Sequence, residues 1–181
     1  MPPRLQPVEP PYSDAVERLL AKMMPPGTEL EPLLLFRVLA LNPELASRAH
    51  PMASGLLNKG LLPARDREVL IGRTTARAGA EYEWGVHAVF FAEVIERDIV
   101  DRLADPDRTG FDDDDLLLVT VVDELHDTAT VSDETWRLLR VRYDDARLIE
   151  LILLTGWYRT LSTLINAAKI PLEPWAARFP Q

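Results

Sequence analysis

Helical periodicity is the sequence feature that most restricts how this chain can fold. Apolar residues recur three and four positions apart along most of its length, whereas the strict alternation that marks a half-buried strand is scarce. Capping residues, prolines and glycines divide the pattern into segments of helix length. The sequence therefore predicts an all-α fold.

The ends of the predicted helices follow from capping signals. Ser13 can cap a first helix, Asn42 precedes a proline at the first helical position, and Gly79 separates two helical segments. Four aspartates at 112–115 complement the dipole of the next helix. We expect helices over residues 14–24, 29–41, 43–59, 63–77 and 99–103, one that carries Glu83 and His87 to about 97, one from 116, one that Ser132 caps and a last one that opens at Asp144 or Asp145.

Length and composition indicate one helical domain with a short extension. The chain has 181 residues, of which 47% are apolar, enough to bury a sizeable core. Residues 1–12 include five prolines and are predicted to form an extended arm, with residues 13–181 as a single domain. Polar side chains interrupt the longest apolar run, residues 148–170, which favours a buried helix over a membrane span. The first residues lack the apolar segment of a signal peptide, so we expect a cytoplasmic protein.

The charge balance and the absence of cysteine argue against several classes of function. Asp and Glu number 29 against 20 Lys and Arg, and the formal net charge of -9 disfavours binding to nucleic acid or to an anionic membrane. Without cysteine the chain can form no disulfide, thiolate nucleophile or zinc–thiolate site. We therefore expect no nucleic-acid or membrane partner, whereas the net charge says little about small-molecule substrates.

Three titratable side chains stand out in the helical region around Gly79. Glu83 and His87 are four residues apart and so share one face of a helix. Glu68 lies one helix earlier, and an antiparallel pair of helices across Gly79 would bring its carboxylate to the same place. A carboxylate beside an imidazole is the usual equipment for proton transfer. The other interpretation is a solvated pair that does no more than stabilise its helix.

Neighbouring residues extend this candidate site. Tyr82 and Trp84 flank Glu83 and can form an apolar wall that contacts substrate and raises the pKa of a nearby carboxyl group by desolvation. A second acid/His pair, Asp123 and His126, lies on a later helix. A metal held between the two pairs is an alternative, but the spacing fits a di-iron bundle on one helix at most, so we expect no metal.

Two further groups of residues have ordinary structural explanations. Surface solvation accounts for most of the arginines at 65, 67, 73 and 77, although these could anchor a substrate carboxylate. The stripe of Trp157, Tyr158, Leu161 and Leu164 is typical of a helix face that packs in a core.

Short segments along most of the chain form a recognisable set. They are Leu41-Asn42-Pro43, Leu61-Leu62-Pro63-Ala64-Arg65-Asp66-Arg67-Glu68, Ala80-Glu81-Tyr82-Glu83-Trp84-Gly85-Val86-His87, Asp123-Glu124-Leu125-His126 with Val131-Ser132-Asp133, Leu148-Ile149-Glu150-Leu151-Ile152, and Leu164-Ile165-Asn166 with Ile170-Pro171-Leu172-Glu173. This set resembles the carboxymuconolactone decarboxylase and alkylhydroperoxidase D-like family, in the branch with Tyr-Glu-Trp-x-x-His. The resemblance implies an all-helical bundle that assembles as a homo-oligomer, often a trimer or hexamer, with its site near subunit contacts.

The resemblance also separates two kinds of chemistry. In the peroxidase branch a Glu precedes a Cys-x-x-Cys pair by one helix and a His follows it. On this sequence the Glu corresponds to Glu68, the His to His87, and the two cysteines to Ala80 and Glu83. Both thiols are missing, so the disulfide cycle of a thiol peroxidase is impossible. The decarboxylase branch needs neither a thiol nor a metal.

The resemblance therefore implies a lyase-type, cofactor-independent acid–base enzyme that acts on a small carbonyl or lactone compound. In this hypothesis His87 is the acid/base, Glu83 its partner and Glu68 the residue that orients the imidazole. Asp123 and His126 recur in the family and are expected to contact substrate. The alternative is a non-catalytic oligomeric binder. An enzyme should leave His87 facing an accessible cavity, whereas a binder should enclose its pocket and saturate the cluster with ion pairs.

Overall fold

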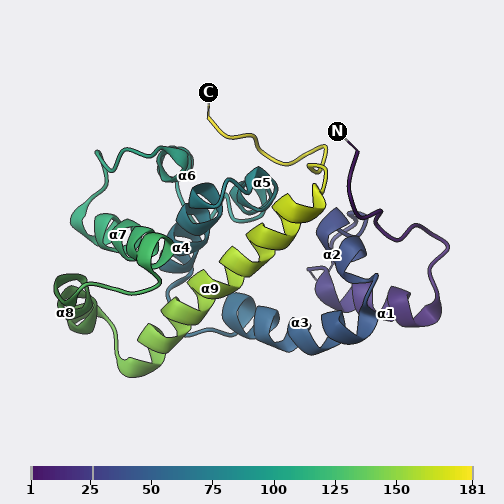
Figure 1. The fold of residues 1–181 in the computed structure, drawn as a ribbon, viewed down its shortest axis with the longest axis horizontal. Coiled ribbons are helices and arrows are strands. Elements are labelled where there is room, and N and C mark those ends of the chain that lie inside the picture. Colours follow the sequence, from purple (N-terminus) through teal and green to yellow (C-terminus); the bar gives the residue numbers. More distant parts are fainter. Residues whose placement is uncertain (1, 26, 181) are drawn as a thin grey trace.

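The computed structural model describes residues 2–25 and 27–180, and every regular element in this part of the chain is a helix (Figure 1). The helices are α1 (Asp14–Met23), α2 (Leu34–Leu39), α3 (Pro43–Asn58), α4 (Ala64–Arg77), α5 (Glu81–Phe90), α6 (Arg97–Ala104), α7 (Asp113–Thr128), α8 (Asp133–Arg142) and α9 (Asp145–Ala168). The all-α prediction is confirmed. The ends of the predicted arm and domain, residues 1 and 181, lie outside the described residues, and the division at residue 12 stays a prediction.

Helix α4 lies at the centre of the bundle. It packs against α5, α6, α7 and α9, and α9 crosses the molecule diagonally beside it (Figure 1). Because α4 is covered on several sides, most of its side chains from Asp66 to Thr75 are buried, charged ones included. A buried charge is costly unless it is paired. The polar side chains of α4 must therefore find partners on the surrounding helices.

Local sequence explains how several helices begin. Five capping side chains each accept a hydrogen bond from the backbone amide three residues ahead, which satisfies one unpaired N–H group of the helix N-terminus. These caps are Ser13, Asn42, Asp112, Ser132 and Asp144. The helix starts predicted from Ser13, Asn42, Ser132 and Asp144 are confirmed.

The turn between α4 and α5 sets the geometry of the candidate site. Gly79 has a φ of 63°, a left-handed conformation that glycine adopts readily. Its amide donates to the carbonyl of Ala76, and the amide of Ala80 donates to the carbonyl of Thr75, which is the hydrogen-bond pair of a Schellman motif. Helix α4 therefore ends at a defined residue, and α5 folds back beside it, as Gly79 predicts.

Two predicted helices are shorter in the structure. The helix predicted over 29–41 begins at Leu34, whose amide donates to Glu173 Oε1 at 2.7 Å from the far end of the chain. The helix predicted to reach residue 97 ends at Phe90, and the chain then turns so that Ile95 is buried in the core. Both boundaries are set by tertiary contacts, which no local signal in the sequence carries.

The described segments near the two ends of the chain, before α1 and after α9, pack on the same side of the bundle (Figure 1). Residues 2–12 carry no helix, and the amide of Arg4 donates to the carbonyl of Ala168 at 2.8 Å. The segment after α9 runs over α5, where the amide of Ala177 donates to the carbonyl of Gly85 at 3.2 Å. These contacts attach both ends of the chain to the bundle.

Helix α9, of 24 residues, is long and apolar enough by length and composition alone to cross a membrane. It packs against α4 in the main core through residues such as Leu151 and Leu154. Its outer face exposes Ile149, Ile152 and Leu153. The packing against α4 accounts for one apolar face, whereas the outer face has no cover within the described residues.

Candidate acid–base site

Glu68, Glu83 and His87 come together where α4 passes α5. His87 Nδ1 lies 2.7 Å from Glu68 Oε2, and His87 Nε2 lies 3.7 Å from Glu83 Oε1. All three side chains are buried, with at most 8% of the residue surface exposed. Because an ionised carboxylate can only accept, Nδ1–H donates to Glu68 and Nε2 faces Glu83 beyond hydrogen-bond distance. The structure thus assembles the three residues that the sequence singled out.

Aromatic rings and one arginine hold the imidazole of His87 in this orientation. Phe91 stacks on the imidazole with ring centroids 5.0 Å apart, and Tyr158 meets it edge-on at 5.1 Å. Arg67 Nε donates to Glu68 Oε1 at 3.2 Å, and its guanidinium lies over the Phe91 ring. The orientation of the imidazole is therefore fixed by a hydrogen bond on Nδ1 and by ring packing.

Burial and the charges of neighbouring side chains raise the pKa values of Glu83, His87 and Tyr158, so these groups bind protons more tightly. Burial raises the pKa of Glu83, and the nearby Glu68 carboxylate adds to the rise, while His87 opposes it. Burial alone would lower the pKa of His87, but the charge and hydrogen bond of Glu68, helped by Glu83, raise it. Burial also raises the pKa of Tyr158, with further contributions from Glu83 and Glu68. The cluster can therefore retain protons that exposed Glu and His side chains would lose.

A small cavity adjoins the cluster. It is lined by Glu68, Gly72, Trp84, His87, Ala88, Ile95, Val100 and Leu103. The volume open to the centre of a water-sized sphere is ≈ 10 Å³, about the space that one water molecule needs. Trp84 therefore stands at the site, as the sequence predicts. The cavity is too small for a lactone in this conformation. It therefore lies beside His87, as expected for an enzyme, but it does not give a substrate access to that residue.

Tyr82 lies on another side of α5. Its hydroxyl donates to Glu173 Oε1 at 2.6 Å and accepts from the amide of Leu35 at 3.1 Å. Its ring belongs to a second apolar cluster, with Val86 and Ile165, and does not line the cavity beside His87. The structure thus gives Tyr82 a fastening contact, and the role in substrate binding stays a prediction that the geometry does not favour.

Asp123 is also placed away from the lining of the cavity. Both of its oxygens accept from Arg73, at 2.8 and 2.9 Å, and Arg77 and Arg108 reach the same carboxylate at 3.3 and 3.0 Å. The carboxylate is saturated by these arginines. We therefore describe Asp123 as a structural ion-pair centre, and its contact with substrate as a prediction without geometric support.

His126, on α7, contacts the guanidinium of Arg159. Burial lowers the pKa of His126, and the positive charges of Arg159 and Arg77 lower it further. It does not line the cavity beside His87. Among residues 2–25 and 27–180, no group of three or more acidic or histidine side chains is placed to hold a metal ion.

Two aromatic residues of the site were not identified from the sequence. Phe91 follows His87 by four positions, so helical spacing could have suggested that the two rings meet. The spacing of Tyr158 predicts an ordinary core stripe, and only the packing of α9 beside α5 brings this ring to the imidazole. Arg67 was one of four candidate arginines, and the structure selects it because it contacts Glu68.

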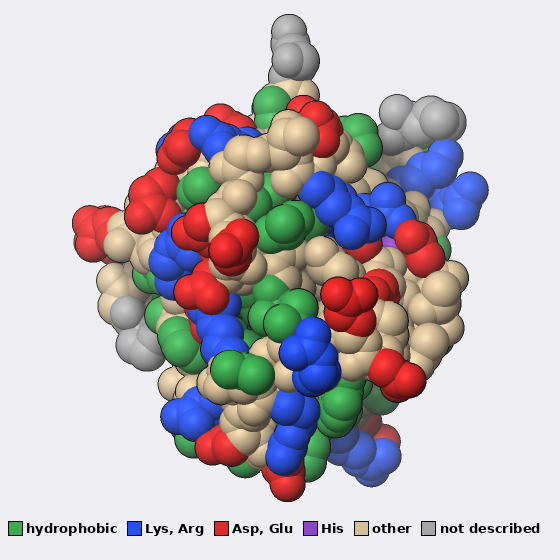
Figure 2. All heavy atoms as spheres, turned by 90° about the vertical axis from the view of Figure 1, so that its left-hand side faces the viewer, with side chains coloured by type: hydrophobic (Ala, Val, Ile, Leu, Met, Phe, Trp, Pro, Cys, Tyr) green, Lys and Arg blue, Asp and Glu red, His purple; other side chains and the backbone are tan. Residues whose placement is uncertain are grey.

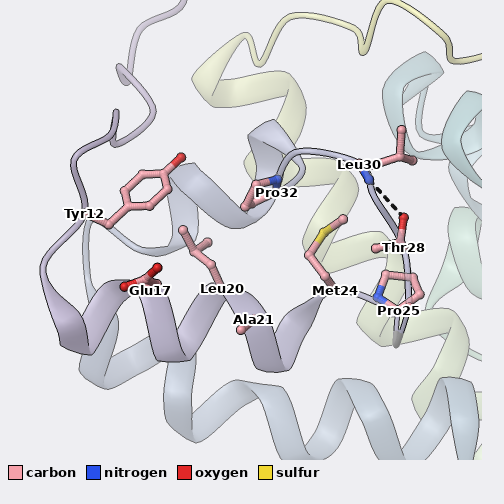
Figure 3. Close-up of a pocket in the computed structure, with 10 residues that line it drawn as sticks. Tyr12, Glu17, Leu20, Ala21, Met24, Pro25, Thr28, Leu30 and Pro32 are labelled. Atoms are coloured by element: carbon pink, nitrogen blue, oxygen red, sulfur yellow. Dashed lines mark hydrogen bonds between the residues drawn. The ribbon is translucent and has the colours of Figure 1, made fainter.

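A larger groove, of about 420 Å³, lies elsewhere, between α1 and the segment that follows it. Figure 3 shows Tyr12 and Glu17 at one end of this groove and Met24, Pro25 and Thr28 at the other. Its lining contains no histidine, so it lacks the paired proton-transfer groups that mark the smaller cavity. Chemistry, rather than volume, selects the cavity beside His87 as the candidate site.

Comparison with known proteins supports the fold. No family model matches the chain, and no curated protein matches it. Among solved structures it is similar to an uncharacterized peroxidase-related protein from Silicibacter sp. TM1040, with a TM-score of 0.81 at 15% sequence identity. The match covers 96% of this chain and 93% of that one. The likeness bears out the prediction of an all-α, alkylhydroperoxidase D-like fold, and at this identity it speaks for the fold alone.

Proposed function

We propose that this protein is a cofactor-independent acid–base enzyme that transfers a proton on a small carbonyl or lactone compound. The observation that carries the proposal is the asymmetry at His87. Nδ1 is held by Glu68 at 2.7 Å, whereas Nε2 faces Glu83 at 3.7 Å and keeps its capacity for proton exchange. A base held by a second residue on its far nitrogen is the usual arrangement for proton transfer by histidine.

The proposed reaction uses each residue in a separate role. In a decarboxylation the bond to the carboxyl carbon breaks, carbon dioxide leaves, and the electron pair passes into the conjugated carbonyl as a dienolate. His87 Nε2 or the protonated Glu83 then delivers a proton to the carbanionic carbon, because both pKa values are raised. Glu68 holds the imidazole, and Arg67 offsets the Glu68 charge. Burial keeps the phenol of Tyr158 protonated, and the ring of Tyr158 packs edge-on against the imidazole of His87.

Thiol peroxidase activity does not fit this chain. The sequence contains no cysteine, and the two positions that correspond to the thiols hold Ala80 and Glu83. A disulfide cycle needs one thiolate to attack and a second thiol to resolve. The description "peroxidase-related" belongs to the structural neighbour, and we do not extend a peroxidase reaction to this protein.

A homo-oligomer and a small-molecule substrate complete the proposal. Ile149, Ile152 and Leu153 expose 59%, 38% and 45% of their surface along one face of α9, and a second copy of the chain could cover them. Acidic and basic side chains intermix on the face shown in Figure 2. Together with the net charge of -9, this supports a proposal without nucleic acid as partner. Sedimentation of the purified protein tests for the trimer or hexamer, and fractionation of cells tests the cytoplasmic location that we propose.

The second candidate is a non-catalytic small-molecule binder. The small volume of the cavity, ≈ 10 Å³, favours it, because the candidate site has no room for a substrate in this conformation. In that case the cluster would persist as a set of buried contacts without turnover.

One experiment separates the two candidates. The purified protein is incubated in deuterated water with a panel of carboxylated lactones and 3-oxo acids, and proton exchange and carbon dioxide release are followed by nuclear magnetic resonance. We expect deuterium to enter at least one compound with the unaltered protein. His87→Ala should reduce that rate by about 10² to 10⁴-fold, whereas His126→Ala should leave it unchanged. Ligand binding without exchange would establish the binder, and unchanged turnover in His87→Ala would remove the assignment of the base.

A further inference from the structure

The last residues of the chain lie across α5 next to the candidate site. We call residues 173–180 the C-terminal strap; it follows α9 and crosses above α5 in Figure 1. The Ala177 amide donates to the Gly85 carbonyl at 3.2 Å, and the Phe179 amide donates to Glu81 Oε1 at 3.0 Å. The strap therefore contacts the same helix that carries Glu83 and His87.

The two ends of the strap are held unequally. At its start, the buried Glu173 accepts from the amide of Leu34 at 2.7 Å and from the hydroxyl of Tyr82 at 2.6 Å. These are short, charge-assisted hydrogen bonds in a buried place, which makes them strong. Farther along, Ala177 and Phe179 contact α5 through longer hydrogen bonds. The strap is thus anchored at Glu173 and more weakly attached beyond it.

The weakly attached part packs on Trp84, which forms a wall of the cavity beside His87. The rings of Phe179 and Trp84 lie 5.1 Å apart, and the Arg97 guanidinium lies 5.7 Å from the centre of the Trp84 ring. Trp84 is 1% exposed, yet its indole N–H meets no hydrogen-bond acceptor in the described chain. Packing, rather than a directional polar contact, therefore holds this wall in place.

The strap backbone at Ala177 lies so close to Gly85 that a larger side chain at this position would displace the strap. A Cβ atom at Gly85 would lie 2.2 Å from the carbonyl oxygen of Ala177, a backbone atom that cannot turn away by a change of rotamer. Alanine favours a helix more than glycine does. Gly85→Ala should therefore displace the strap while it preserves α5.

We propose that the C-terminal strap is a gate for the candidate site: residues 177–180 lift from α5, Trp84 swings outward, and the cavity beside His87 opens to a small-molecule substrate. This proposal rests on the proposed function, because it assigns the route by which substrate reaches His87. It explains how a cavity of ≈ 10 Å³ can serve a substrate for which sites of roughly 300 Å³ or more are usual. Glu173 stays in place as the anchor of the moving segment.

The test measures access to His87 without any substrate. Diethyl pyrocarbonate acylates neutral imidazoles, and mass spectrometry reports the rate for each histidine, with His50 and His126 as internal references. Relative to these, we expect acylation of His87 to accelerate about tenfold in Phe179→Ala, the change expected for the loss of one aromatic pair. Gly85→Ala should accelerate it at least as much. Gly55→Ala, on α3 with nothing within 4 Å of the added Cβ, is the matched control and should have no effect.

Hydrogen exchange in the unaltered chain gives a second measurement that needs no variant. If the gate exists, the amides of Ala177 and Phe179 exchange faster than those in the middle of α5, through an opening that leaves the helix intact. Two results would overturn the gate. One is that the strap amides exchange only together with the amides in the middle of α5. The other is that the rate of His87 acylation stays unchanged in Gly85→Ala and Phe179→Ala while the helicity of the protein is also unchanged. If the protein turns over a compound but the gate test fails, only the gate proposal is wrong and the proposed function stands. If the gate opens but no compound is turned over, only the proposed function is wrong.

Discussion

Helix α4 contributes buried charges to two clusters, one around Arg73 and one around Glu68, and the two clusters differ in how their polar atoms are paired. Toward the C-terminal end, Arg73 donates two hydrogen bonds to Asp123, and Arg77 and Arg108 reach the same carboxylate. Toward the N-terminal end, Glu68 meets an imidazole whose other nitrogen is left 3.7 Å from its nearest acid, Glu83. A saturated ion pair stabilises a fold and has nothing left to exchange. Buried charge is thus a poor sign of function by itself, and a proton-binding atom with spare capacity is a better one.

The largest effect expected from this comparison is on stability. Asp123→Ala leaves the buried guanidinium of Arg73 without its main partner, and we expect a loss of about 3–5 kcal/mol in the free energy of unfolding. Urea denaturation of the pure protein measures it. Asp127→Ala is the control, because its pair with Arg77 is half exposed and should contribute less than about 1 kcal/mol. A loss as small as that of the control would show that the Asp123 cluster is not the structural centre that we describe.

The next effect concerns catalysis. In Glu68→Gln the side-chain amide can donate to Nδ1, so the imidazole loses the tautomer that its acid–base role requires. We expect the rate of proton exchange to fall about 10²-fold or more, while the free energy of unfolding changes much less than in Asp123→Ala. Glu96→Gln removes an exposed partner of Arg65 and should leave the rate unchanged. A Glu68→Gln protein with full activity would place this cluster in the same structural class as the Asp123 cluster.

A smaller effect concerns how the free energy of unfolding depends on pH through Glu83. Burial raises the pKa of Glu83 in the folded state, so the stability linked to its protonated form is present at acidic pH and is lost as the pH rises through that raised value. Each unit of elevation is worth about 1.4 kcal/mol. Glu83→Gln cannot ionise, so it should match the unaltered protein at low pH and exceed its stability at alkaline pH. Thermal unfolding across a pH series measures the difference, and a gap that narrows or reverses with rising pH would contradict the sign.

The smallest effect tests the assignment of Tyr82. Tyr82→Phe removes one hydrogen bond to Glu173 and one from the amide of Leu35, and we expect a cost of about 1 kcal/mol in stability with no change in proton exchange. Tyr143→Phe, which removes a comparable bond to Asp66, is the matched control. Loss of activity in Tyr82→Phe alone would restore Tyr82 as a substrate-binding residue.

Much of the candidate site could be predicted because its determinants are local. Glu83 and His87 share a face by helical spacing, and Gly79 ends α4 so that the next helix returns beside Glu68. Trp84 follows from its place next to Glu83. Asp123 and His126 do not line the cavity beside His87, and their spacing could not have shown this, because a spacing of three marks a common face but does not say which neighbour that face meets.

Other features could not be predicted because they join residues far apart in the sequence. The start of α2 depends on Glu173, which is 139 positions away from Leu34. Tyr158 reaches His87 only through the packing of α9, and Phe179 reaches Trp84 only through the path of the chain after that helix. Such contacts depend on the relative placement of whole elements, which periodicity does not encode.

The sequence by itself determined that this protein is built from helices, where most of them begin, and that it carries an acid–imidazole pair but no thiol. Periodicity, caps and composition are properties of short segments, so they act before the chain is assembled. Only the tertiary structure decided that Glu68 would pair with His87, that several arginines would pair with Asp123, and that the cavity beside His87 would be no larger than ≈ 10 Å³. Those outcomes depend on which charges are buried together, because removal from water is what forces each buried charge to find a partner.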